Sequence, residues 1–108
     1  MYTENPEAST QFYSGVLGLE CTRDAGGARI FATEDSDVIG VCRVFADRVI
    51  EPTGSRISMV TDDVDAWYRR LLAHDLVIDS PQRLASFGLY SLLVRDPNAY
   101  ASEFQQFQ

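Results

Sequence analysis

The chain has 108 residues, of which 45% are hydrophobic and 23% are charged, and its net charge is −7. This length suits one domain with a single core, and the composition is that of a folded protein. The acidic surplus and the scattered basic residues argue against a nucleic-acid surface and agree better with a neutral or cationic small ligand. Since the chain has no apolar run long enough for a membrane span and no signal-like N-terminus, we expect a cytoplasmic protein without membrane contact.

The two cysteines, Cys21 and Cys42, both lie in runs with strand character. They fit no C-x-x-C spacing, so we expect buried, reduced thiols rather than a disulfide or a metal clip. Reduced thiols agree with a reducing compartment such as the cytoplasm.

The first half of the chain predicts one helix followed by three strands. Asn5-Pro6-Glu7 is typical of a helix start, and the helix is expected to run to about Leu17, with Gly18 in a left-handed conformation after it. A short strand is expected before the helix. The strands after it are predicted over residues 19–25, 28–33 and 37–45.

The second half repeats this order after a loop that contains Pro52 and Gly54. Asp62 and Asp63 indicate a second helix start, and apolar residues at helical spacing follow from Val64 to Leu72. Strands are predicted over residues 56–61, 76–86 (weak, and broken by Pro81), 89–95 and 100–107.

Each half therefore reads β-α-β-β-β, and a unit that cannot cover its own sheet usually packs against a copy. We expect an α+β fold in which two βαβββ modules form mostly antiparallel sheets that curl around a cleft, with the helices outside. The whole chain, 1–108, is expected to be one domain. Its parts are module 1 (about 1–46), a loop (47–55) and module 2 (about 56–108).

Three stretches carry a family resemblance: 6–20 (PEASTQFYSGVLGLE), 61–75 (TDDVDAWYRRLLAHD) and 95–104 (RDPNAYASEF). They resemble the first helix, the second helix and the last hairpin of the vicinal oxygen chelate superfamily. That superfamily includes glyoxalases, extradiol dioxygenases, fosfomycin-resistance enzymes and bleomycin-binding proteins. In the last hairpin, Ala99 stands where relatives commonly have glycine, and alanine disfavours a left-handed turn conformation.

The resemblance implies four metal-ligand positions, which metal-dependent members fill with His, Glu or Gln from the first, fourth, fifth and eighth strands. Here the first position would lie ahead of Met1, and the others fall at Gly40, Arg56 and Glu103. Glycine offers no ligand atom and a guanidinium repels a metal, so only Glu103 keeps a suitable oxygen. One protein oxygen is too few for a transition metal, and we expect no metal and no other cofactor.

Arg56 and Glu103 are expected to point into the same cleft. They would pair there and hold a polar ligand, or remain as a relic ion pair without a ligand. Alternation along the strands adds neighbours to this pair. The candidate ligand-binding cleft consists of Val38, Gly40, Cys42, Arg56, Ser58, Val60, Ala101, Glu103 and Gln105.

No catalytic residue is assigned, because His74, the only histidine, is expected at a helix C-terminus with no nucleophile beside it. Three functions remain open. We favour a metal-free homodimer that binds a small organic, possibly cationic, ligand. The second is a lyase, isomerase or dioxygenase that uses Glu103 as a base or binds a metal in another way, and the third is a degenerate module kept for dimerisation or partner binding.

Overall fold

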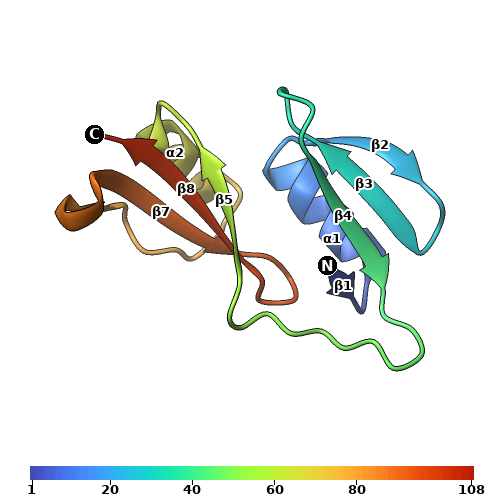
Figure 1. Ribbon diagram of the computed structural model, residues 1–108. Coiled ribbons are helices and arrows are strands. Elements are labelled where there is room, and N and C mark those ends of the chain that lie inside the picture. The colour runs from blue at the N-terminus through green and yellow to red at the C-terminus, as the bar shows by residue number, and fades with distance from the viewer. The chain divides into compact units, whose positions relative to one another are not determined.

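The computed structural model describes all residues, 1–108, and the chain divides into two units, Met1–Thr53 and Gly54–Gln108. Each unit contains a four-stranded sheet with one helical segment against one of its faces (Figure 1). No helix in the structure is long and apolar enough to cross a membrane.

The helix of the first unit begins where the sequence predicts. Asn5 Oδ1 accepts hydrogen bonds from the backbone N–H groups of Glu7 and Ala8, and Pro6 occupies the first turn. The helix starts as α1 (Pro6–Thr10) and continues as a π-helical segment, η1 (Gln11–Val16). Gly18 follows with φ of 77°, so the predicted helix and its left-handed end are confirmed, whereas the π geometry was not predicted.

The sheet of the first unit, the first sheet, has the strand order β1-β4-β3-β2. The short β1 runs parallel to β4, and the other neighbours are antiparallel. The three strands predicted after the helix are confirmed. The bounds are β1 (Tyr2–Thr3), β2 (Glu20–Asp24), β3 (Ala28–Ala32) and β4 (Val38–Arg43).

The second unit has the same strand order, β5-β8-β7-β6, with β5 parallel to β8. Its helix, α2 (Val64–Ala73), begins at Asp63, whose side chain accepts from the backbone N–H of Ala66. Of the weak strand predicted over 76–86, only three residues form a strand in the structure. The bounds are β5 (Arg56–Val60), β6 (Gln82–Leu84), the 3₁₀ turn η2 (Ala85–Phe87), β7 (Leu89–Arg95) and β8 (Ala101–Phe107).

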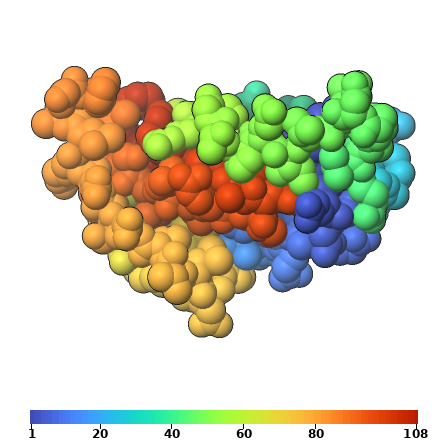
Figure 2. Space-filling view, turned by 90° about the horizontal axis from the view of Figure 1, so that it is seen from below, coloured from blue at the N-terminus to red at the C-terminus, as the bar shows by residue number.

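The segment between α2 and β6 explains why that strand is short. Residues 76–81 form no ladder pairs, and Val77 is fully exposed. Figure 2 shows this amber stretch at the surface of the second unit. Pro81 has no N–H to donate to a neighbouring strand, so pairing starts only at Gln82.

Each sheet packs one face on its own helix. In the first unit Tyr13 stacks on Phe31 of β3, with ring centroids 5.7 Å apart, and both side chains are fully buried. In the second, Trp67 of α2 stacks on Phe104 of β8 at 4.4 Å. These contacts place the aromatic side chains of Tyr13 and Trp67 between helix and sheet. We call the opposite side of each sheet its helix-free face.

The repeat extends to local hydrogen bonds. Before α1, the N–H of Asn5 donates to Thr3 Oγ1 at 3.2 Å, and before α2 the N–H of Asp63 donates to Thr61 Oγ1 at the same distance. The α+β class, the two βαβββ modules and the mostly antiparallel sheets are therefore confirmed, and the sheets are not closed into a barrel.

Two details differ from expectation. Ala99 adopts φ of 67°, the left-handed conformation that its side chain disfavours. Asp96 fixes the turn, because its Oδ1 accepts from the N–H groups of Asn98 and Tyr100. Cys21 and Cys42 are free, but Cys21 is exposed because every residue of the edge strand β2 is exposed.

Candidate functional site

The helix-free face of the second sheet carries the predicted pair. Along β8, Phe104 stacks on Trp67, and Gln106 Oε1 accepts from the backbone N–H of Val64, so these two side chains face α2. Alternation then turns Glu103 to the helix-free face, together with Ala101 and Gln105.

β5 supplies the second row of this face. Because β5 and β8 pair in parallel, Arg56 lies opposite Ala101, Ser58 opposite Glu103 and Val60 opposite Gln105. All three β5 side chains are exposed, whereas the intervening Ile57 and Met59 are partly buried. The register thus places the six second-unit residues of the candidate site on one face of one sheet.

Arg56 reaches diagonally from its own row to Glu103. Its Nη1 donates to Glu103 Oε2 at 2.7 Å, and Gln105 Nε2 donates to the other carboxylate oxygen, Oε1, at 2.8 Å. The Glu103 side chain is only 11% exposed, while that of Arg56 is 55% exposed. The carboxylate is therefore engaged on both oxygens, and the guanidinium covers it from the solvent side.

These contacts determine the charge of Glu103. The hydrogen bond from Gln105 lowers its pKa most, burial opposes this, and the hydrogen bonds from Arg56 and Ser91 lower the pKa further. The net result is a pKa below the ordinary glutamate value. Glu103 is thus an anion at neutral pH and a weak proton acceptor.

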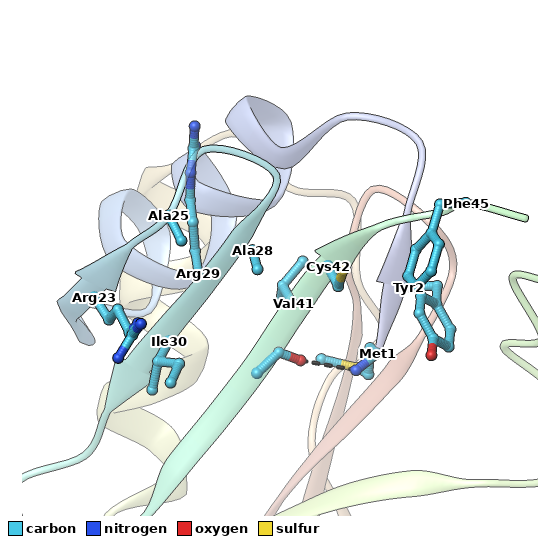
Figure 3. Close-up of a pocket in the computed structure, with 11 residues that line it drawn as sticks. Met1, Tyr2, Arg23, Ala25, Ala28, Arg29, Ile30, Val41, Cys42 and Phe45 are labelled. Carbon is cyan, nitrogen blue, oxygen red and sulfur yellow. Dashed lines mark hydrogen bonds between the residues drawn. The ribbon is translucent and has the colours of Figure 1, made fainter. Parts of the chain in front are cut away.

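The first sheet contains a pocket of about 380 Å³ on its helix-free face. Gly40 and Cys42 of the candidate cleft line it, whereas Val38 is 62% exposed and does not. The sequence did not single out the other lining residues. Among them are Arg23, Ala28, Ile30, Tyr2 and Phe45 (Figure 3).

Residues 1–104 match the family model described as the Glyoxalase/Bleomycin resistance protein/Dioxygenase superfamily. The chain belongs to this superfamily. The match covers both units and therefore confirms the resemblance drawn from the two helices and the last hairpin.

Solved structures of the superfamily fold are similar over the whole chain. A lactoylglutathione lyase from Agrobacterium tumefaciens has a TM-score of 0.80 at 23% identity, covering 100% of this chain and 93% of its own. TnmS3, an antibiotic-binding protein from Streptomyces sp. CB03234, has a TM-score of 0.80 at 21% identity with the same coverage. An integron cassette protein from the Halifax Harbour sewage outfall metagenome reaches 0.84 at 19% identity, covering 99% and 93%. No curated protein matches.

The superfamily's metal positions can be compared with the residues present. The hydrogen bonds that Thr3 and Thr61 accept before the two helices make Tyr2 of the first unit equivalent to Val60 of the second. Tyr2 pairs with Cys42 and Val60 pairs with Gln105, so Cys42 is equivalent to Gln105. Two residues earlier on β4 and on β8, Gly40 is therefore equivalent to Glu103. No three His, Cys, Asp or Glu side chains come together as a metal site. A glycine, an arginine and a carboxylate with both oxygens engaged do not fit a divalent metal.

His74 caps the C-terminal end of α2 and is exposed, as expected. Its side chain makes no hydrogen bond to a Ser or Cys side chain that would give a nucleophile and base pair.

Proposed function

We propose that this chain is a metal-free small-molecule binding protein, which holds a small organic ligand on the helix-free faces of its sheets. The observation that carries the proposal is the position of Arg56 on Glu103. A guanidinium has five N–H donors, and only Nη1 is used within the chain. The remaining donors lie on a half-exposed side chain and are free for the acceptor groups of a ligand.

The superfamily supports binding as well as catalysis. A lactoylglutathione lyase and an antibiotic-binding protein share the fold at similar TM-scores, so the fold alone does not choose between them. The choice rests on the side chains of this chain. Where a metal would act as the electrophile, Arg56 presents a permanent positive charge.

Glu103 as the general base of an enzyme has less support. A base works best when its pKa lies near the working pH, and the pKa of Glu103 is shifted in the opposite direction. The ion pair also blocks the approach of a substrate proton to Oε2. The same engagement weakens the case for a cationic ligand at this position, since no carboxylate oxygen is left without a partner.

The proposal includes a cytoplasmic homodimer whose ligand sites lie close to the second copy. The free thiols and the lack of a membrane-spanning helix agree with this location. No contact with nucleic acid is proposed, because the chain is acidic and its basic side chains form no continuous stripe.

A thermal-shift screen with neutral and charged organic compounds tests the proposal. We expect compounds that raise the melting temperature of the wild type in proportion to their concentration and are recovered chemically unchanged. Arg56→Gln should weaken the binding of such a ligand, whereas Arg69→Gln on the exposed side of α2 should not. Far-UV circular dichroism confirms that the variants are folded.

Besides a screen that finds no ligand, two results would overturn the proposal. One is stoichiometric nickel, zinc, manganese or iron in the protein purified without chelators, because a bound metal would restore the enzymatic alternative. The other is unchanged ligand affinity in folded Arg56→Gln, because the ion pair would then play no part in binding.

A further inference from the structure

The pocket of the first unit is lined by two arginines and no carboxylate, although the chain carries 16 acidic residues. Arg29 is engaged on the other side of the sheet, where its guanidinium donates to Thr10 Oγ1 at 2.8 Å and to Glu7 at 3.2 Å. Figure 3 shows the guanidinium group of Arg29 pointing away from the pocket. The side chain of Arg23 makes no hydrogen bond or ion pair within the chain.

A β-bulge turns Arg23 to the pocket side. Cys21 lies opposite Phe31, and Arg23 lies opposite Ile30, so Thr22 is an extra residue in β2. Without the bulge, Arg23 would lie opposite Arg29 and point to the helix side. Bulges often redirect a side chain at a functional site, and this one brings a free cation beside Ile30 (Figure 3).

Gly40 lies near Arg23 and, because it has no side chain, leaves space in the pocket. Arg23, Ile30 and Gly40 form one row across β2, β3 and β4. A Cβ added to Gly40 would meet no atom within 4 Å, and its backbone is outside the left-handed region. The space that Glu103 fills in the second unit is therefore empty in the first.

Aromatic rings close the opposite end of the pocket. Tyr2 lies opposite Cys42 on β1, and its ring packs edge-on against Phe45 with centroids 6.3 Å apart. Arg48 lies over both rings, 5.7 Å and 5.6 Å from their centroids, within the range of cation–π interactions. From β2 to β1 the pocket spans three strand spacings, about 14 Å.

We propose that this pocket binds an amphipathic organic anion, with its carboxylate on Arg23 and its apolar body over Gly40 toward the rings of Tyr2 and Phe45. A volume of about 380 Å³ is in the range of small-ligand sites. The guanidinium matches a carboxylate, and the aromatic end matches a flat apolar group. The inference rests on the proposed binding of small molecules by the helix-free faces and names the ligand class for the face of the first sheet, where Arg56 is not among the lining residues.

Three probes with the same biphenyl body and different charge test this assignment: 4-biphenylcarboxylate, 4-phenylbenzyl alcohol and 4-phenylbenzylammonium. By isothermal titration calorimetry, the wild type should bind the carboxylate at least tenfold more tightly than the ammonium, with the alcohol between them. Arg23→Gln should weaken the carboxylate about tenfold and leave the alcohol unchanged. Arg69→Gln, the same change of charge on α2, should leave all three affinities unchanged.

Gly40→Leu provides the second variant. Its side chain should fill the hollow without strain, so the melting temperature should not fall, while binding of the carboxylate and the alcohol should be lost. The protein therefore stays folded where binding fails. A loss of affinity in this variant localises the probe to the pocket.

Four results would overturn the inference, and the first three are tighter binding of the ammonium, equal weakening of all probes in Arg23→Gln, and full carboxylate affinity in Gly40→Leu. Failure of all three probes to bind the wild type would overturn it as well. None of these results removes the proposed function, which fails only if the unbiased screen finds no ligand, Arg56→Gln binds as the wild type does, or a stoichiometric metal is present.

Discussion

Ala99 is the residue whose backbone conformation fits its side chain least. Its φ of 67° is costly for alanine, by about 1 to 2 kcal/mol. Glycine avoids this cost but loses more entropy on folding, by about 0.5 to 1 kcal/mol. We therefore expect Ala99→Gly to raise the free energy of unfolding by about 0.5 to 1 kcal/mol, measured by urea denaturation. Ala32→Gly, at the end of β3 where Ala32 pairs with Val38 and has no left-handed backbone, should lower it, and a loss of stability in Ala99→Gly would contradict the strain at this turn.

Glu103 should give the chain a defined pH dependence. Its pKa lies below the ordinary value of 4.5, so the unfolded chain takes up this proton at higher pH than the folded chain. The stabilisation is complete above about pH 4.5 and is lost as the pH falls through the lowered pKa. The stability difference between wild type and Glu103→Gln should therefore be largest at neutral pH and shrink below pH 4.5.

Urea midpoints of both proteins at pH 7, 5, 4 and 3 measure this difference. The other carboxylates are common to both proteins, so their effect cancels. Glu20→Gln, on an exposed strand residue without an ion pair, gives the control and should show no such trend. A difference between wild type and Glu103→Gln that stays constant from pH 7 to pH 3 would show that the carboxylate is not stabilised by its partners.

At the scale of elements, the helix starts are set by single side chains. Asp63 Oδ1 accepts from the N–H of Ala66 at 2.9 Å, whereas the adjacent Asp62 is exposed and makes no such bond. Asp63→Ala should lower the free energy of unfolding by about 1 kcal/mol, while Asp62→Ala should change it by less than about 0.5 kcal/mol. Thermal unfolding followed by circular dichroism separates the two. Equal effects would indicate a general charge effect at the helix end rather than a cap.

The elements that the sequence predicted well have strong local signals. Asn5-Pro6 and Asp63 specify the helix starts, and the apolar spacing after them specifies the buried faces. The strand at 76–86 was predicted too long because Pro81 lacks an N–H for pairing, and its apolar residues lie in a loop instead. The π-helical turn at Gln11–Val16 has no sequence signal of its own, although it carries Tyr13, which packs on Phe31 of β3.

The candidate site was also predicted only in part, because residue counting along a strand places side chains correctly only where the strand alternates regularly. Strict alternation in β5 and β8 was enough to place Arg56, Glu103 and Gln105 on one face. In β2 alternation fails at Thr22, and the bulge gives Arg23 a neighbour that residue counting does not predict. The hollow at Gly40 is also a property of the folded sheet, because glycine in a sequence does not show which space its missing side chain leaves.

At the scale of the whole molecule, the two units use one architecture for different local chemistry. The counterpart positions are Glu103, which is buried under an arginine, and Gly40, which opens a pocket. Both helix-free faces also carry exposed apolar side chains, such as Val38 at 62% and Phe107 at 65%. Exposed apolar side chains that share a face with a candidate site often mark an interface, which agrees with the expected homodimer.

Sedimentation velocity over a concentration series tests the dimer. We expect a dimer for the wild type at micromolar concentration and a shift toward monomer for Phe107→Asp, because a carboxylate would be desolvated at the interface. Phe87→Asp is the matched control, since Phe87 is 75% exposed but belongs to η2 rather than to the ladder of the sheet. If Phe107→Asp stays dimeric while folded, or if Phe87→Asp dissociates equally, the helix-free face of the second sheet is not the surface that joins the copies.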